Sequence, residues 1–529
     1  MNSQDQLTRS SLLLTAVLAV ALVLIAGGMG VYVLADRDLH MAFQFTSLAM
    51  EIDHVYNGQV DHKQLVESAR EAMFERLDRF SGYIDKEQFN RINEEFSGAY
   101  SGIGVTVVPH EQGLLIMSVR ENGPADKVGL LSGDILIAAD GHDLGELGAT
   151  GSVDRLRGPD GTDVRAAAYR PSNGDTVEVT ITRARIPLLH IPYAGYMPDS
   201  VLYVRILDFE SGASEDLKAA LDSLLTPDRR PSGLILDLRG NPGGLLREAY
   251  HTANMFLDEG QFIVGTDGRS RWNEEKYYST GADITGGIPM AVLVDGGSAS
   301  AAEIVSGSLQ QLGRAMLVGD KTFGKGLVQG LTRFPNGDGV RLTISRYYLA
   351  NGVYLNEFDS TLHDIGTGLV PDYYVDFTER HQFPRVLENS LLLQEFANAH
   401  QDEIVERSAA FNLSDDWVKK FEEYAREQGF VYHSATTQQA DLLTDLTVLE
   451  QKSQKMVAAA RDILHQSQKI DMDQFDFYSG YIKTRLKQLA YERKFGSYRT
   501  YRDVIVRERP DILFTAELLK QARNDKQGS

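Results

Sequence analysis

Three glycine-bearing segments hold the residues whose types and spacing could do chemistry. They are residues 236–244 (LDLRGNPGG), 295–303 (DGGSASAAE) and 319–329 (GDKTFGKGLVQ). Each follows or adjoins a short apolar run of the kind that predicts a buried strand. Glycines let a chain turn sharply where a strand ends. The candidate reactive side chains are therefore expected in loops at strand ends.

In the second segment, small residues follow the strand and a helix is predicted to begin near Ala301. Ser300 then stands at a helix N-terminus. Exposed N–H groups and the helix dipole favour developing negative charge at such a place. This suits a nucleophile whose attack creates an oxyanion. It also suits an ordinary N-cap serine, and this segment alone does not separate the two.

In the third segment, Lys325 stands between glycines and near apolar residues. An apolar setting lowers the pKa of a lysine, and the neutral amine can then act as a base. The alternative is an exposed lysine in a β-turn. In the first segment, Gly243 and Gly244 could present backbone N–H groups to an oxyanion, or could simply turn the chain.

Other catalytic classes find no support in the residues. The chain has no cysteine, which excludes thiol proteases, disulfides and cysteine-zinc sites. It has no G-x-S-x-G elbow and no H-E-x-x-H zinc helix, and none of the 12 histidines lies in a glycine-rich strand-end segment. No metal site and no cofactor are therefore expected.

The net charge of −21 restricts the partners. Nucleic-acid binding needs clustered Lys and Arg, so an acidic chain of this kind argues against it. The same charge argues against docking on an anionic membrane surface.

One segment near the N-terminus predicts contact with a membrane in another way. Residues 12–34 carry no charge, and a helix of this length would reach ~34 Å, enough for a ~30 Å hydrocarbon core. A cleaved signal peptide is the alternative, although the apolar run exceeds the usual h-region of ~7–15 residues. We expect an uncleaved transmembrane anchor.

Changes in residue composition and in the apolar pattern along the chain predict the domain boundaries. Residues 1–38 form the tail and anchor (or signal peptide), and residues 39–95 are helical. Short alternating runs with glycine turns over 96–185 indicate a mainly-β domain. Alternating apolar strands and helices over 186–376 indicate an α/β core. Residues 377–529 hold only four of the 48 glycines and are predicted to be helical. Within them, an apolar series from Leu442 to Ile463 predicts one helix whose seam packs inside this region.

Together the three segments resemble those of the carboxy-terminal processing peptidases, also called tail-specific proteases. In that family an L-R-x-N-x-G-G loop precedes an S-A-S-A-x-E nucleophile loop and a T-F-G-K-G-x-V-Q segment, and all three occur here in that order. Residues 100–105 (YSGIGV) and 157–162 (RGPDGT) look like the PDZ domain of the family, and 366–372 (GTGLVPD) is a further match. The resemblance spans roughly residues 65–372.

The resemblance implies a function and a set of roles. The family nucleophile is the second serine of its loop, which is Ser300, and the family lysine lies 25 positions on, which is Lys325. The family also uses a glutamine four positions further, which falls on Gln329. On a straight strand Lys325 and Gln329 would lie ~13 Å apart, so either the chain bends there or Gln329 acts by another route. Some members have an acid eleven positions after the serine, where this chain has Gln311.

The implied fold is an α/β protease core related to the Clp protease and crotonase groups, with an inserted mainly-β PDZ domain, an N-terminal transmembrane helix and a C-terminal all-α domain. The implied mechanism is a Ser–Lys acyl transfer that needs no cofactor. For the oxyanion hole we expect backbone N–H groups of Gly243 or Gly244 and of Ala301.

We expect substrates to be proteins or peptides with free C-termini. A PDZ domain adds a C-terminal tail to a sheet edge while a glycine loop holds its carboxylate. That loop would be Gly102, Ile103, Gly104 and Val105. The anchor implies a single-pass protein of the cytoplasmic membrane with its catalytic domain on the periplasmic side, and the C-terminal helices could bind a second copy or an adaptor. The alternative function is an inactive membrane-tethered PDZ scaffold.

Overall fold

The chain divides into a small unit that ends at Leu77 and a large unit that begins at Asp78. The small unit contains α2 (Arg37–Val55) and α3 (His62–Phe74), and the Asp61 side chain caps α3 by accepting from two N–H groups of its first turn. The computed structural model describes residues 37–96, 98–171, 173–269, 274–358, 364–408, 413–450 and 452–528.

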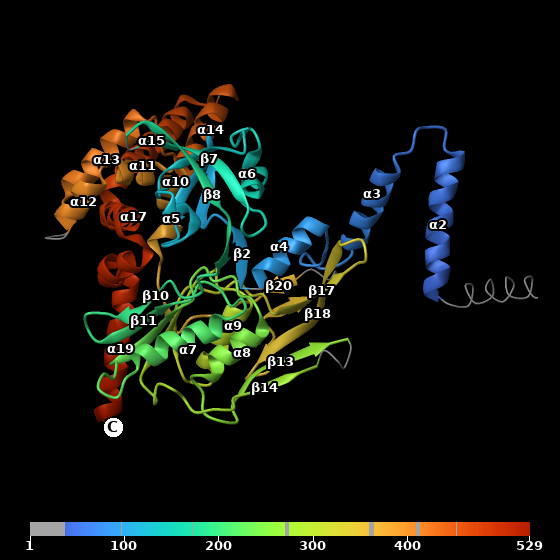
Figure 1. Ribbon diagram of the computed structural model, residues 1–529. Helices are drawn as coiled ribbons and strands as arrows, with labels where there is room; N and C mark the ends of the chain where they lie inside the picture. Colours follow the sequence, from blue (N-terminus) through green and yellow to red (C-terminus); the bar gives the residue numbers. More distant parts are fainter. Residues whose placement is uncertain are drawn as a thin grey trace, which may run out of the picture. The chain divides into compact units, whose positions relative to one another are not determined.

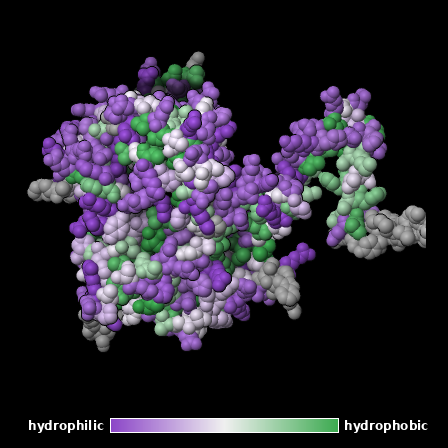
Figure 2. All heavy atoms as spheres, viewed as in Figure 1, coloured by the Kyte–Doolittle hydropathy of each residue, from purple (hydrophilic) through white to green (hydrophobic). Residues whose placement is uncertain are grey.

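The predicted anchor, residues 12–34, lies outside the described residues. Within them, no helix combines the length and apolarity that crossing a membrane requires. Helix α2 exposes large apolar side chains, and Figure 2 shows hydrophobic residues on its surface. These side chains are Leu39, Met41, Phe43, Phe45, Leu48, Met50 and Val55.

A β-rich domain follows helix α4 (Lys86–Phe96) in the large unit. Its sheet has the order β3-β4-β5-β7-β8, with β6 paired to β5. Among the described residues β3 pairs with β4 alone, so β3 is an edge strand. The strands are β3 (Val105–His110), β4 (Gly113–Val119), β5 (Ile135–Ala139), β6 (His142–Asp143), β7 (Asp163–Arg170) and β8 (Asp175–Thr182).

Two helices and one further strand pair complete this domain. The helices are α5 (Pro124–Lys127) and α6 (Gly148–Leu156). Strands β2 (Ala99–Gly102) and β9 (Ala184–Pro187) pair antiparallel, so the chain enters and leaves the domain side by side. This arrangement is that of a domain inserted into another.

The core of the large unit is a six-stranded sheet of order β10-β11-β12-β15-β16-β21. From β11 onward its neighbours are parallel, and β10 runs antiparallel to β11. Strands β12 and β15 are buried along their whole length, as expected for parallel strands covered on both faces. The strands are β10 (Tyr193–Tyr196), β11 (Val201–Arg205), β12 (Gly233–Asp237), β15 (Met290–Val294), β16 (Met316–Gly319) and β21 (Tyr373–Tyr374).

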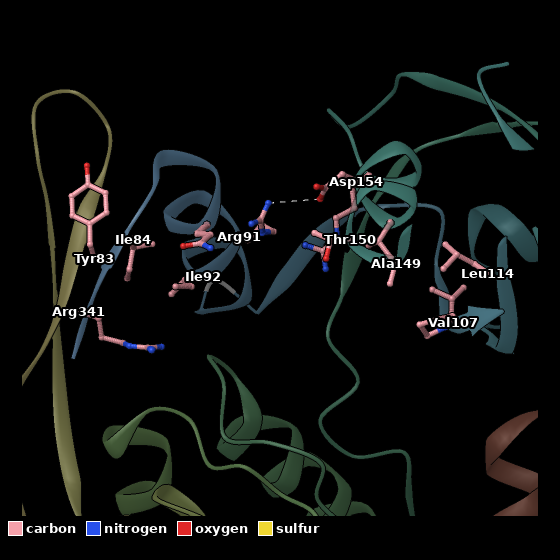
Figure 3. Close-up of a pocket in the computed structure, with 15 residues that line it drawn as sticks. Tyr83, Ile84, Arg91, Ile92, Val107, Leu114, Ala149, Thr150, Asp154 and Arg341 are labelled. Atoms are coloured by element: carbon pink, nitrogen blue, oxygen red, sulfur yellow. Dashed lines mark ion pairs between the residues drawn. The ribbon is translucent and has the colours of Figure 1, made fainter. Parts of the chain in front are cut away.

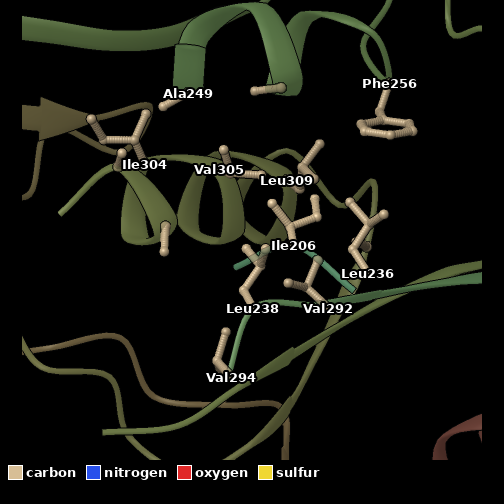
Figure 4. Packing of buried hydrophobic residues seen from close by; sticks show 14 of the residues in the cluster. Ile206, Leu236, Leu238, Ala249, Phe256, Val292, Val294, Ile304, Val305 and Leu309 are labelled. Carbon is tan, nitrogen blue, oxygen red and sulfur yellow. The ribbon is translucent and has the colours of Figure 1, made fainter. Parts of the chain in front are cut away.

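Helices cover both faces of this sheet. On one face, α7 (Ala213–Leu224), α8 (Leu246–Asn254) and α9 (Ala301–Gln311) pack on the alternate side chains of the strands. Figure 4 shows Val305 and Leu309 of α9 among Ile206, Leu236 and Val292. Burying each such side chain contributes roughly 1.5–3 kcal/mol. On the other face lies α19 (Pro510–Gly528), the last helix of the chain, whose apolar residues join the opposite side chains of the strands.

A second, antiparallel sheet lies beside the first and carries the lysine segment. Its order is β1-β18-β13-β14, and β17 also pairs with β18. Strand β1 precedes the β-rich domain in sequence. It pairs with β18, which lies more than 200 residues after β1 in the chain. The strands are β1 (Gly82–Ile84), β13 (Phe262–Gly268), β14 (Lys276–Tyr278), β17 (Leu327–Arg333) and β18 (Gly339–Leu349); β19 (Asn356–Phe358) and β20 (Asp364–Gly366) form a separate hairpin.

The C-terminal region is helical from Gln382 onward and has a core of its own. Figure 1 shows α14 (Ala435–Leu449) and α15 (Gln454–Met472) side by side. The other helices are α10 (Gln382–Asn389), α11 (Leu392–Ala399), α12 (Gln401–Ser408), α13 (Asp415–Glu427), α16 (Gln474–Phe477), α17 (Ser479–Thr500) and α18 (Val506–Glu508), with a π-helical turn at Tyr501–Ile505.

The prediction of a single, inward-packed seam in this region is wrong. The chain breaks between α14 and α15, and the two helices pack through small side chains such as Ala440, Thr444 and Ala460. Most large residues of the series remain at the surface, with Leu442 60% and Leu449 76% exposed. Apolar periodicity does not distinguish a helix face that packs within its own domain from one that faces outward.

Candidate active site

Ser300 lies at the turn between β15 and α9, as the N-cap residue of the helix. Its φ of 55° places a non-glycine residue in a region that L-residues rarely adopt. Such backbone strain gathers at functional sites when the surroundings impose it. The Ser300 N–H donates to Glu303 Oε2 at 2.9 Å, which is one of the contacts that hold the turn.

The neighbouring Ser298 has a different environment. It is fully buried, and its hydroxyl donates to the carbonyl of Leu238 at 2.7 Å and accepts from the N–H of Asp295 at 2.9 Å. Ser298 therefore links the turn that carries Ser300 to the loop that follows β12, whereas Ser300 is half-buried and takes part in the capping box of α9.

Two buried side chains hold Ser300 and Lys325 together. Glu303 Oε2 accepts from the N–H of Ser300 and from that of Lys325, the latter at 2.8 Å. The hydroxyl of Tyr347, on β18, is within hydrogen-bond distance of the carbonyls of the same two residues, 3.1 Å from that of Ser300. The strand-end loops that carry the two residues are thus fixed to one another.

The Glu303 carboxylate is itself well supported. Its Oε1 accepts from the Thr322 hydroxyl at 2.5 Å and from the N–H of Gly324 at 2.7 Å. Burial raises the pKa of this carboxyl, and these hydrogen bonds act in the opposite direction. Glu303 is the third residue after the N-cap, so the S-x-x-E capping-box pattern was a signal in the sequence that could have identified it.

Lys325 is half-buried in apolar surroundings. Its Nζ lies 5.1 Å from the centre of the Phe80 ring and 3.3 Å from Gln329 Oε1. Burial lowers the pKa of Lys325, and the nearby charge of Arg341 lowers it further, while Asp78 and Glu303 act to raise it. Among the described residues no hydrogen bond joins Nζ to the Ser300 hydroxyl.

Gln329 reaches Lys325 because the chain between them is not a straight strand. Lys325 precedes β17, and the pairing of β17 with β18 shifts register between Val328 and Gln329. The Gln329 amide nitrogen donates to the Phe80 carbonyl at 2.7 Å, which turns the amide oxygen toward Lys325. The sequence offered no signal for Phe80, which lies more than 240 residues away.

The loop that follows β12 brings Gly243 against Ser300. A Cβ at Gly243 would come within 2.8 Å of the Ser300 Cβ and 2.9 Å of the Ala301 nitrogen, so only glycine fits. The Gly243 N–H donates to Asn241 Oδ1 at 2.9 Å. Gly244 instead lies against the backbone of Phe209. Ala301 opens α9, where N–H groups have no acceptor within the helix.

Gln311 is remote from these residues. It ends α9, about 16 Å along the helix from Ser300. Its Oε1 accepts from the N–H of Asn351 at 3.1 Å. The side chain at this position therefore supports a loop and takes no part in the site.

The four residues expected to hold a substrate tail lie at the start of the β-rich domain. Gly102 ends β2, Val105 begins β3, and the carbonyls of Ile103 and Gly104 accept from the N–H groups of two residues of the same domain. Ile103 is only 2% exposed and belongs to the core of the domain. It therefore does not line an open pocket.

A pocket of about 580 Å³ lies further along β3, beside α6 (Figure 3). One wall comes from β3, β4 and α6, with Val107, Leu114 and Val153, and the other from β1 and α4. An ion pair of 3.7 Å between Arg91 of α4 and Asp154 of α6 joins the two walls. An extended peptide that paired with the edge of β3 would enter this pocket.

Comparisons with known proteins identify the family. A family model of Peptidase family S41 matches residues 200–375, and a PDZ domain model matches residues 101–187. The carboxy-terminal-processing protease of Bartonella bacilliformis is 31% identical over 382 residues, which cover 71% of this chain and 85% of that protein. The chain belongs to the carboxy-terminal processing proteases.

Other relatives agree with this assignment. The carboxy-terminal processing protease CtpA of Bacillus subtilis is 31% identical over 350 residues, covering 65% of this chain and 74% of that protein. Among solved structures, the photosystem II D1 C-terminal processing protease is 24% identical over 62% of this chain and 85% of its own, with a TM-score of 0.37 that adds nothing to the assignment.

This carboxy-terminal processing protease is therefore a serine-type peptidase that acts on proteins. It combines the S41 protease fold with a PDZ domain and a C-terminal helical region. The helices from Gln382 onward and the turn before them lie beyond the matched peptidase region, which ends at residue 375.

Proposed function

We propose that Ser300 is the nucleophile and Lys325 the general base of a Ser–Lys endopeptidase. The observation that carries the proposal is the shared support of the two residues by Glu303 and Tyr347, which fixes their backbones relative to one another. The lowered pKa of Lys325 supports the role of a base, because the neutral amine can accept a proton.

The reaction follows from these roles. Neutral Lys325 takes the proton of the Ser300 hydroxyl as its oxygen attacks the scissile carbonyl, and the peptide N–H group of Ala301 stabilises the oxyanion. The protonated lysine then gives its proton to the leaving amine, and an acyl-enzyme remains. Water deprotonated by Lys325 hydrolyses the ester. Gln329 orients the Lys325 Nζ in both its neutral and its protonated form, and Gly243 joins the oxyanion hole when its N–H leaves Asn241.

The test is cleavage of an unstructured protein by the purified enzyme. Ser300→Ala and Lys325→Ala are each expected to lower kcat by ~10⁴-fold or more with an unchanged circular-dichroism spectrum, because members of a catalytic unit fail together. Ser298→Ala serves as the matched control and should cost far less. Equal losses for both serines, or full activity of Ser300→Ala, would refute the assignment, whereas no cleavage by the wild-type enzyme would favour the inactive-scaffold alternative.

We further propose that the PDZ domain selects substrates by their free C-terminal tails. The unpaired edge of β3 and the adjoining pocket support this, since a tail can add to the edge as a strand. In this proposal Gly102, Gly104 and Val105 form the entrance that receives the carboxylate, and Ile103 supports them from the core.

We also propose that residues 1–36 anchor the protease in the cytoplasmic membrane, with the catalytic domain on the periplasmic side. The uncharged run 12–34 supports the proposal. Detergent-dependent recovery from the membrane fraction tests it, and recovery of the full chain without detergent would contradict it.

Finally, we propose that a second copy of the chain covers the outward stripes of α14 and α15. Besides Leu442 and Leu449, these stripes expose Leu446, Met456 and Ile463. Charges favour a pairing of α14 with α15 of the other copy, because α14 carries two aspartates and no Lys or Arg, whereas the three basic residues of α15 (Lys455, Arg461 and Lys469) outnumber its two aspartates.

A further inference from the structure

The C-terminal region returns to the catalytic loops at two points beyond the matched peptidase segment. The first is the turn Thr378–Arg380, directly after the core sheet. The second is the start of α19, where Arg509 precedes the helix and Asp511 lies in its first turn. We call these four residues the clamp: Glu379, Arg380, Arg509 and Asp511.

The clamp holds the loop that follows β12 through Arg239. The Arg239 guanidinium is buried between Asp237, at the end of β12, and Asp511 of α19. Burial by itself would raise the pKa of Asp511, but Arg239 and Arg509 bring it below its ordinary value. Arg509 also binds Glu379 at 2.6 Å, so the two points of the clamp are connected.

The position of Arg239 in turn determines the position of the oxyanion loop. The two loop residues that follow Arg239 are tied to the nucleophile turn: the Gly240 N–H donates to Asp295 at 2.7 Å, and the Asn241 carbonyl accepts from the Ala299 N–H at 2.9 Å. Gly243 follows Asn241 by two residues and lies against Ser300. A displacement of Arg239 would therefore be transmitted to Gly243.

The other point of the clamp joins the nucleophile loop to the lysine loop. The Arg380 guanidinium pairs with Asp295, at 3.2 Å, and with Asp320. Asp295 begins the nucleophile loop and Asp320 begins the loop that leads to Lys325. The Phe377 ring lies between the guanidinium groups of Arg239 and Arg380, 5.4 and 5.6 Å from its centre. All three catalytic loops thus meet the C-terminal region.

We propose that the clamp positions the three catalytic loops, so that the C-terminal region is a part of the active site rather than an appended module. This inference rests on the proposed Ser–Lys site and deepens it. The clamp residues act as positioning residues, because they hold the loops that carry the reacting atoms and do not touch substrate. A misplacement of ~1 Å at such a distance can cost about 100-fold in rate.

The first experiment is Asp511→Asn in the full-length enzyme. The variant keeps the size of the side chain but removes the charge that holds Arg239. We expect kcat for a short peptide to fall by ~10–100-fold with KM changed by less than about threefold, since transition-state contacts are lost and ground-state contacts are kept. The affinity for a peptide aldehyde, whose adduct with the serine presents the oxyanion, should fall in parallel with kcat/KM.

The matched control lies on the same helix. Lys520 of α19 pairs with Asp199 at 2.7 Å at the surface. It lies on the same helix as Asp511, about 14 Å further along the helix axis. Lys520→Gln should leave kcat and aldehyde affinity at wild-type values. If Lys520→Gln lowers kcat and aldehyde affinity as much as Asp511→Asn does, α19 acts only through general stability and the proposal is overturned.

A double variant separates positioning from folding. Removing the charge of Asp511 alone leaves the buried guanidinium groups of Arg239 and Arg509 with one carboxylate fewer, since only Asp237 and Glu379 remain, and this destabilises the chain. Arg509→Leu combined with Asp511→Leu removes both charges and should recover much of the thermal stability. Arg239 still lacks its contact with α19 in this variant, so kcat should stay low. Recovery of kcat together with stability would refute the clamp.

The outcome can be told apart from a failure of the proposed catalytic residues. If Ser300→Ala retains activity, the Ser–Lys assignment fails whatever the clamp variants do. If Ser300→Ala is inactive while Asp511→Asn, folded by circular dichroism, keeps wild-type kcat and aldehyde affinity, the clamp alone is refuted. Arg380→Gln is a second, independent test at the junction of the nucleophile loop and the lysine loop. We expect it to lower kcat and aldehyde affinity as Asp511→Asn does.

Discussion

In the proposed mechanism Lys325 must lose its proton before it can accept the one on Ser300, so the groups around its Nζ set the pH at which the enzyme works. The pKa of Lys325 lies below its ordinary value of 10.5, chiefly through burial and then through Arg341. Activity should therefore rise with pH through this lowered pKa, and not show the profile of a histidine. The enzyme should be unaffected by metal chelation.

Two substitutions should move this rising limb in opposite directions. Arg341→Met removes a repelling charge, which raises the pKa of Lys325 and moves the limb to higher pH. Asp78→Asn removes an attracting charge, which lowers the pKa and moves the limb to lower pH. The measurement is kcat/KM against pH for a short peptide. Shifts of the same sign in both variants would show that Lys325 is not the titrating base.

The sequence indicates the residues proposed to react but not what holds them. Ser300, Lys325 and Gln329 lie in short motifs whose spacing is local. Phe80 and Tyr347 contact them across long separations in the chain, and aromatic residues at such positions look like any others. The register shift that lets Gln329 reach Lys325 is likewise a property of the pairing with β18, which no local pattern specifies.

At the scale of elements, the pocket between α6 and α4 supports the proposal that the PDZ domain recognises substrate tails. We expect a substrate with a free, apolar C-terminus to be cleaved several-fold faster than the same chain with an amidated end. Val153→Asp places a charge in the pocket wall and should remove this preference, while short peptides are cleaved as before. The measurement is the ratio of kcat/KM for the two substrates.

A control for this prediction lies on the opposite edge of the PDZ sheet. Val177 is on β8, at the far end of the strand order from β3. Val177→Asp should retain the preference for free tails. Equal cleavage of free and amidated substrates by the wild-type enzyme would show that tails are not selected in this way.

Elements with a buried face were the predictable ones. The apolar runs that became β11, β12 and β15 could be predicted because parallel strands are covered on both sides and lack polar positions. The role of α19 could not, since its pattern indicates a helix but not that it covers the far face of the protease sheet. The same ambiguity explains why the α14–α15 series was expected to pack inward.

For the molecule as a whole, the C-terminal region has two surfaces with different uses. Its turn at Thr378–Arg380 and helix α19 complete the protease core, as the clamp and the packing on β12 indicate. The α14–α15 pair lies outside that core, and Figure 2 shows hydrophobic residues gathered at its end. A surface of this kind is rare on a chain that works alone, because large exposed apolar patches mark interaction sites.

The last prediction concerns the oligomeric state. A chain without residues 1–36 should have the mass of at least two copies when chromatography is coupled to light scattering, because the outward stripes of α14 and α15 gain from mutual burial. Leu446→Asp, at the centre of the α14 stripe, should convert it to single chains at micromolar concentration by burying an unpaired charge. Val353→Asp is the matched control, since Val353 has a similar exposure (50% against 44%) but lies in the protease core region. This control should keep the wild-type mass. A wild-type mass of one chain at every concentration would contradict the second-copy proposal, while leaving the catalytic site and the clamp as they are.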